Sequence, residues 1–239
     1  MLKDTYNLSK DQYHLLGIWT KKTQNENYYK CLCKEISYYE SCLKMLKNKH
    51  GEEKIDYRHY LIVAYLESIY FKDYEFPQNF DEFQGSGIFN DNRIDLIVNN
   101  IQKAQKNLKF LIEHHKKNED HKSLFVYYEL LGDLEIHIFC YFQEFKSRIN
   151  RELLLKAFLY YKISIWHKTQ LERSNPTTYY DGLHGWESHN IFHDFYRKLR
   201  VKSLTNVRDK EEKLQLKYPL NPEEYTQLIK LSMREINGE

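Results

Sequence analysis

The sequence predicts an all-α protein of about seven to eight amphipathic helices that pack as antiparallel hairpins. The first observation is a shortage of turn-forming residues, because the 239 residues include only 8 glycines and 4 prolines. Few turns over such a length require long elements, which are typically helices rather than strands of about five or six residues. The second observation is that apolar side chains recur every three or four residues along most of the chain. Because 41% of the residues are hydrophobic and 29% are charged, we expect a folded core rather than wholesale disorder.

Three helices are predicted in the first part of the chain. Ser9 and Gln12 form a capping-box pattern at the start of a helix over about 9–22. A regular apolar stripe predicts a second helix over about 25–50. The third helix, over about 52–73, is apolar on several sides, so we expect it to be buried at the centre of this part.

A long connection is predicted over 74–92, where Pro77, Gly85 and Gly87 interrupt the helical pattern. Residues 73–95 contain six acidic residues and one basic residue, which gives this stretch a net charge of −5. Loops longer than about 12 to 15 residues are usually functional or disordered. Two interpretations are open, a loop whose aromatic side chains fill the core or an acidic recognition loop. The aromatic residues interleaved with the acids are Phe76, Phe80, Phe83 and Phe89.

The middle of the chain predicts three successive helices. One spans about 92–117, with Asp91 or Asn92 as its N-cap, and the next spans about 121–146. Gly132 lies inside the second of these and indicates either a break or a close helix crossing. After a short turn, Asn150 can cap a third helix, so these last two helices should form an antiparallel hairpin.

The C-terminal part combines a second connection with two more predicted helices. The connection covers 168–186 and precedes a basic helix over about 187–216. Within it, residues 197–217 carry eight basic and three acidic residues, a net charge of +5. The last helix, over about 222–236, follows Asn221 as its N-cap and begins with a proline and two glutamates.

The whole-chain properties favour a cytoplasmic, helical binding protein over an enzyme. The net charge of +2 gives no reason to expect nucleic acid or an anionic membrane as an obligatory partner. The first residues lack the order of a signal peptide, and no apolar run is long enough to span a membrane. We expect one domain over 1–239, or two halves (1–74 and 92–239) joined by the loop 75–91. Phosphate-binding and nucleophile-elbow motifs do not occur, so we expect no cofactor and no catalytic residues.

Two alternative functions can be derived from the residues. His189 and His193 lie four residues apart, so on a helix they could chelate one metal ion together with His184, as in a metal-dependent hydrolase. However, the stretch HNIFH has Asn where the zincin motif has its general base. The other alternative is a nucleic-acid binder, in which the basic stretch 197–217 contacts phosphates while neighbouring aromatic side chains stack on bases.

The 21 tyrosines favour a protein-binding surface. Tyr is enriched in interfaces because its ring offers a rigid contact area and a hydroxyl at little entropic cost. In adjacent tyrosine pairs, we expect one ring to point inward and the other to lie towards a flank of the helix. The leading hypothesis is therefore a surface formed by the acidic loop and exposed aromatic residues. Its candidate residues are Glu75, Phe80, Asp81, Glu82, Phe83, Phe89, Asp91, Tyr179, Tyr180 and Trp186.

Two resemblances refine this hypothesis. The segments YYELLGDLE and KAFLYYKISI, within residues 123–166, are similar to a tetratricopeptide-like helix pair. In size, stacked amphipathic helices and aromatic content, the whole chain resembles the all-helical immunity proteins of bacterial polymorphic-toxin and type VI secretion systems. This resemblance implies that the protein neutralises a cognate toxin by stoichiometric binding. A toxin with a basic cleft would complement the acidic loop.

Overall fold

The computed structural model describes residues 26–46, 52–69, 91–146, 150–174 and 207–238. Within these ranges the chain forms seven α-helices and no strand, which confirms the predicted all-α class. The helices are α2 (Glu26–Met45), α3 (Glu52–Ile69), α4 (Asp91–Lys116), α5 (His121–Lys146), α6 (Arg151–Ser174), α8 (Val207–Lys217) and α9 (Pro222–Asn237).

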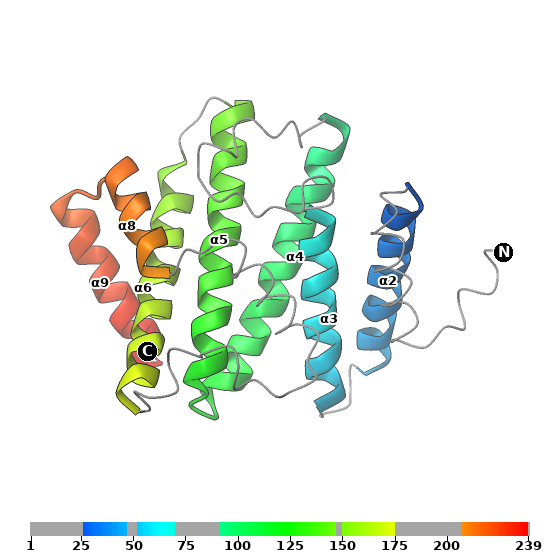
Figure 1. Cartoon of the computed structure of the whole chain (residues 1–239), viewed down its shortest axis with the longest axis horizontal. Helices are drawn as coiled ribbons and strands as arrows, with labels where there is room; N and C mark the ends of the chain where they lie inside the picture. The colour runs from blue at the N-terminus through cyan, green and yellow to red at the C-terminus, as the bar shows by residue number, and fades with distance from the viewer. Residues whose placement is uncertain (1–25, 47–51, 70–90, 147–149, 175–206, 239) are drawn as a thin grey trace.

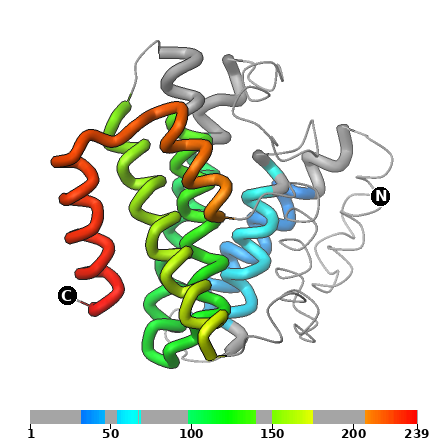
Figure 2. Tube along the Cα trace, turned by 60° about the vertical axis from the view of Figure 1, so that its left-hand side comes forward, coloured from blue at the N-terminus to red at the C-terminus, as the bar shows by residue number. Residues whose placement is uncertain are grey.

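The helices follow one another in a row, from α2 at one end to α9 at the other (Figure 1). Each helix from α2 to α6 packs against the next, and α6 also contacts both α8 and α9. Figure 2, turned by 60°, shows the last two helices lying against α6. Along the row, α4, α5 and α6 alternate in direction, as expected for helices joined by short connections (Figure 1). No helix among the described residues is both long enough and apolar enough to cross a membrane.

The predicted helix boundaries agree closely with α4, α5 and α9, but the boundary of α6 was predicted wrongly. The second connection does not begin at residue 168, because α6 continues to Ser174. The residues 168–173 contain no helix breaker, and Leu171 extends the apolar face towards the core. The predicted helix over 9–22, the connection 74–90 and residues 187–206 lie outside the described residues.

The helix α5 is the most deeply buried element of the row. Its side chains from Ser123 to Phe139 are all buried, since α4 covers one side and α6 the other. One apolar cluster joins residues of α2 to α6, and a second joins α5, α6, α8 and α9. The division into one domain or two halves stays a prediction.

The close helix crossing at Gly132 is confirmed. The helix α5 runs through Gly132 without a break. A Cβ atom at this position would lie 2.6 Å from Cδ1 of Tyr161 on α6, well inside van der Waals contact. Glycine is therefore required here because the Tyr161 ring packs directly on the α5 backbone.

Candidate functional site

The residues predicted to form the binding and metal sites lie outside the part of the chain that can be described. Asp91 is an exception in its backbone only, because it is the first residue of α4. The remaining predicted partner-binding residues are Glu75, Phe80, Asp81, Glu82, Phe83, Phe89, Tyr179, Tyr180 and Trp186, and the predicted metal ligands are His184, His189 and His193. In the described ranges, no group of three or more His, Cys, Asp and Glu side chains is arranged to hold a metal ion.

The strongest candidate for a binding surface among the described residues lies on α9. This helix begins with a complete capping box, in which the Asn221 side chain accepts from the backbone N–H of Glu224 at 2.8 Å. The Glu224 carboxylate also receives two hydrogen bonds from Arg151 of α6, at 2.8 and 2.6 Å. These contacts, with Leu228 and Ser232 buried against the row, fix the orientation of α9. The opposite side of the helix is directed to solvent.

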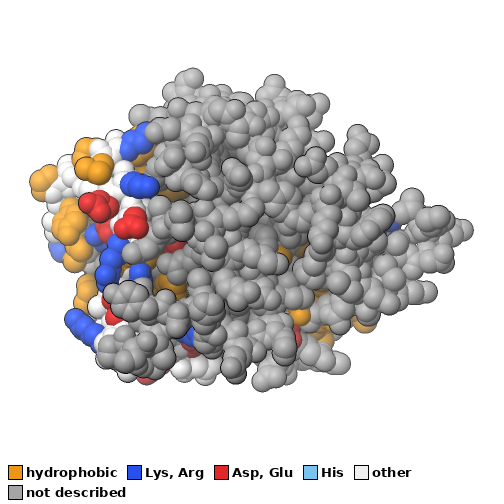
Figure 3. Space-filling view, in the orientation of Figure 1, with side chains coloured by type: hydrophobic (Ala, Val, Ile, Leu, Met, Phe, Trp, Pro, Cys, Tyr) orange, Lys and Arg blue, Asp and Glu red, His pale blue; other side chains and the backbone are white. Residues whose placement is uncertain are grey.

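Large apolar side chains are exposed along α9 next to its buried face, where the centroid of the Tyr225 ring lies 5.1 Å from Lys162 Nζ of α6. Tyr225, Ile229 and Met233 are spaced by four residues, so they form one stripe, and they are 48%, 39% and 48% exposed. Leu231 is also exposed, at 41%, but it points to the other flank of the helix. In Figure 3, apolar side chains gather at the left edge of the view, where Figure 1 places α8 and α9. A concentration of exposed apolar residues on one short helix is typical of an interaction surface.

The basic stretch 197–217 is described only from Val207, where α8 begins, and part of it is not solvated. The Lys210 side chain packs against α5 and is only 14% exposed, with its Nζ 2.9 Å from Glu129 Oε1 and 2.7 Å from Asp133 Oδ2. Two exposed or half-buried ion pairs hold the same helix to α6, between Lys162 and Glu211 (2.6 Å) and between Arg208 and Glu172 (3.0 Å). These cations are therefore paired within the protein rather than presented together to a nucleic acid.

The cluster around Lys210 has strongly perturbed electrostatics. Burial raises the pKa of Asp133. Burial alone would lower the pKa of Lys210, but the carboxylates of Asp133 and Glu129 outweigh it, so that the pKa is raised and the ammonium group stays charged. His137, one turn further along α5, has a pKa lowered to about 3 by burial and by Lys210. Because Glu129 and Asp133 are 0% and 6% exposed, we interpret the cluster as a charged anchor that holds α8.

The acidic half of this cluster has a pattern in the sequence, but its basic partner does not. Glu129, Asp133 and His137 lie four residues apart, on one face of a helix that is apolar elsewhere. Ionisable residues on an otherwise buried helix need partners from another element. Lys210 meets that need from a helix 77 residues away, a distance that no local pattern spans.

A second polar network lies at the turn between α4 and α5. The Asp120 carboxylate binds His115 Nδ1 at 2.8 Å and the Ser123 backbone N–H at 3.1 Å. Burial would raise the pKa of Asp120, but these hydrogen bonds hold it well below its usual range. An ionised carboxylate only accepts, so Nδ1 of His115 donates to it, and Nε2 of the same ring lies 3.4 Å from the Tyr127 hydroxyl. The Tyr127 oxygen lies 2.7 Å from Nε2 of His59 on α3, which links three helices.

Two histidines next to this turn, His121 at the start of α5 and His167 of α6, contact each other. His121 Nδ1 and His167 Nδ1 are 2.8 Å apart, so one ring donates a proton and the other accepts it. The His167 ring stacks on Tyr128, with centroids 5.6 Å apart. Burial, together with the neighbouring His121 and Lys116, lowers the pKa of His167 to about 3. This ring is therefore neutral at physiological pH.

The tyrosine pairs follow the predicted pattern in two of the three cases that can be described. Tyr39 and Tyr161 are buried, whereas their neighbours Tyr38 and Tyr160 are half-buried on a flank. Tyr127 and Tyr128 depart from the prediction because both are buried. Their helix, α5, is covered on both sides, so it has no solvent-exposed flank at this position.

Comparisons with known proteins identify no relative. No protein-family model, no curated protein and no solved structure matches the chain. The class that the fold defines is an all-α protein whose helices pack in a row, each against its neighbours.

Proposed function

We propose that this protein acts by binding another protein, as an immunity-type protein that neutralises a cognate toxin through direct contact. The observation that carries the proposal is the exposed apolar stripe of Tyr225, Ile229 and Met233 along α9. Large apolar side chains on a soluble surface gain free energy when a partner covers them. A capped helix anchored to α6 presents them in a fixed arrangement.

The acidic loop 75–91 remains part of this proposal as a second contact with the partner. Its charge would complement a basic cleft, such as the one by which a toxin acts on nucleic acid or nucleotides. Complementary charges mainly accelerate association, whereas buried apolar residues mainly slow dissociation. The loop and α9 are therefore expected to affect different rate constants.

The test is purification of the protein with its partner from the native host, followed by identification of the partner by mass spectrometry. The partner is then expressed in cells with and without this protein, and growth is measured. We expect the partner alone to stop growth and the protein to restore it in a one-to-one complex.

The α9 surface is tested with the double substitution Ile229→Gln and Met233→Gln. We expect a loss of affinity of at least about tenfold, since two apolar contacts of roughly 1 kcal/mol each would be lost. The matched control is Met45→Gln, which removes an exposed methionine of α2 at the other end of the row. Equal affinities for all three proteins would exclude α9 from the interface, and a partner that is harmless when expressed alone would exclude the toxin interpretation.

A further inference from the structure

Arg58 of α3 is held in place but has no anionic partner within the described part of the chain. Its guanidinium carbon lies 3.7 Å from the centroid of the Phe110 ring on α4, and its Nη1 donates to Asn107 Oδ1 at 2.6 Å. Among the described residues no carboxylate pairs with it, and its Nε is buried without an acceptor. Burial lowers the pKa of this guanidinium, and no nearby acid opposes the effect.

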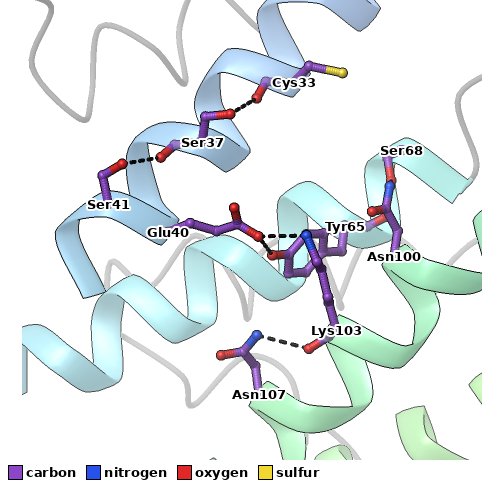
Figure 4. Close-up of polar contacts among 9 residues, drawn as sticks. All are labelled: Cys33, Ser37, Glu40, Ser41, Tyr65, Ser68, Asn100, Lys103 and Asn107. Carbon is purple, nitrogen blue, oxygen red and sulfur yellow. Dashed lines mark hydrogen bonds and ion pairs between the residues drawn. The ribbon is translucent and has the colours of Figure 1, made fainter. Parts of the chain in front are cut away.

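The residues around Arg58 determine its orientation. Asn107 donates from Nδ2 to the backbone carbonyl of Lys103 at 2.9 Å, so its Oδ1 points towards α3 and accepts from Arg58. Figure 4 shows Lys103 of α4 beside the carboxylate of Glu40, with Asn107 one turn further along α4. That carboxylate is already occupied, because it accepts from Lys103 Nζ at 2.8 Å and from the Tyr65 hydroxyl at 2.6 Å. Both described hydrogen bonds of the Glu40 carboxylate are thus made to residues other than Arg58.

The surface around the guanidinium is cationic and aromatic. Lys54 lies one turn from Arg58 on α3, with its Nζ 5.7 Å from the Phe110 centroid, and no ion pair involves it among the described residues. Phe110 is 37% exposed although it is a large apolar residue. Two cations over one partly exposed ring give a small site that combines positive charge with an apolar edge.

This arrangement is costly if its only role is structural. A half-buried charge without a counter-ion, with one N–H lacking an acceptor, lowers stability relative to a neutral side chain. Charged groups that lack a partner within the protein are expected at functional sites, where a ligand supplies the missing partner. Stacking and the Asn107 contact also reduce the conformational entropy that Arg58 would lose on binding.

We propose that Arg58, Lys54 and Phe110 form a site for a carboxylate of an acidic segment on the protein partner. The Nη groups of Arg58 bind the carboxylate, since Nε is buried, and Lys54 adds a second positive charge. This inference rests on the proposed function, and it assigns to the partner an acidic contact separate from the basic cleft expected opposite the loop 75–91.

The experiment is an NMR titration of the full chain with a hexaglutamate peptide at low and at physiological salt. We expect the backbone amides around Asn107 and Phe110 to shift, and the affinity to fall as salt is raised. Arg58→Gln should raise the dissociation constant at least about tenfold, the loss expected for one charged hydrogen bond. Arg58→Lys, which keeps the charge but loses the planar group, should raise it by a smaller factor. The matched control is Arg234→Gln on α9, which makes the same charge change and should leave the dissociation constant within about twofold.

Several outcomes would overturn the proposal. One is an equal loss of affinity in the Arg234→Gln control, which would indicate a general charge effect. Another is tighter binding of inorganic phosphate than of the peptide at the same amides, which would assign the site to a phosphate ligand instead. Thermal melting distinguishes a role in binding from a role in stability. We expect Arg58→Gln and Arg58→Met to have melting temperatures no lower than that of the wild type. A large drop in both variants would show that the guanidinium stabilises the fold. If the host yields no protein partner while the peptide shifts still depend on Arg58, the proposed function fails and the anion site stands.

Discussion

Replacing Lys210 with methionine tests whether α8 is held by a buried charge. The substitution keeps most of the unbranched side chain but removes the ammonium group that lies 2.9 Å from Glu129 and 2.7 Å from Asp133. Both carboxylates are buried, so they cannot recover the lost interaction from water. Removing one partner of a buried ion pair costs about 3–5 kcal/mol, and we expect Lys210→Met to lower the free energy of unfolding by this amount at pH 7.

The loss should depend on pH in a defined direction. Burial already raises the pKa of Asp133 in the folded protein, and loss of the cation raises it further above its unfolded value. A carboxyl group with a raised folded pKa binds more protons in the folded state, so acidification stabilises the variant relative to the wild type. The difference in unfolding free energy between the two proteins should therefore narrow between pH 7 and pH 5, by up to about 1.4 kcal/mol per pH unit for each carboxyl that takes up a proton.

The assay is urea denaturation followed by circular dichroism at pH 7, 6 and 5. Lys213→Met is the matched control, since Lys213 lies exposed on the same helix, and its effect should stay within about 0.5 kcal/mol. Adding Glu129→Gln and Asp133→Asn to Lys210→Met should restore most of the lost stability, because neutral groups are less costly to bury than unpaired charges. A loss below about 1 kcal/mol for Lys210→Met, or a loss that does not change with pH, would refute the buried anchor.

Four further predictions follow from the structure. Gly132→Ala should destabilise the protein by about 1–3 kcal/mol in thermal or urea unfolding despite the better helix propensity of alanine, because the new methyl group would overlap the Tyr161 ring; a stabilised variant would contradict the close crossing. His167 has a pKa of about 3 in the folded protein and an ordinary pKa in the unfolded chain, so the unfolded state binds more protons below pH 6.5. The free energy of unfolding should therefore fall on acidification, by up to about 1.4 kcal/mol per pH unit. His167→Gln should reduce this pH dependence between pH 6 and pH 5. Tyr128→Phe should cost about 1.5–3 kcal/mol by denaturation, since a carboxylate of α9 loses a hydroxyl donor at 2.8 Å, and a neutral result would show that water replaces that donor. In binding kinetics with the identified partner, alanine at three acidic residues of the loop should slow association and weaken its salt dependence, whereas unchanged rates would remove the loop from the interface. These three residues are Asp81, Glu82 and Asp91.

The fold could be predicted from the sequence where helix signals are local. The capping box at Asn221 and the apolar periodicity of α4 and α5 involve residues within one or two turns of each other, so the pattern determines the element. The end of α6 could not be located in this way. We expected a connection from residue 168 onward because Pro176 and two glycines follow. However, no breaker lies before Ser174, and the apolar face continues through Leu171.

The polar contacts between helices could not be predicted, because their partners are distant in the sequence. Lys210 belongs to a segment with a strongly charged composition, which by itself indicates a solvated helix face. Its burial depends on two acids of α5 that happen to meet α8 after folding. Arg58 was missed for a related reason, since neither its stacking on Phe110 nor its lack of a carboxylate can be read from residue spacing.

The abundance of tyrosine has a structural explanation that changes its bearing on function. Three buried tyrosines each donate their hydroxyl to a carboxylate on another helix, and a lysine from a third helix binds the same carboxylate oxygen. The three sets are Tyr65, Glu40 and Lys103, then Tyr128, Glu235 and Lys116, then Tyr161, Asp133 and Lys210. Each set joins three different helices, and the aromatic ring fills apolar space while its hydroxyl satisfies a carboxylate that would otherwise be costly to bury.

These tyrosines therefore serve the interior, so a high tyrosine count is weaker support for a binding surface than the sequence indicates. The proposal of protein binding depends instead on exposed residues that have no evident role in packing the core. Those residues are the apolar stripe of α9 and the aromatic and cationic site around Arg58, which lie on different helices of the row. A partner that contacts both would have to extend along the row rather than dock at one end of it. Substitutions at Ile229 and at Arg58 should then weaken one and the same complex, with additive free energies because the two residues share no contact.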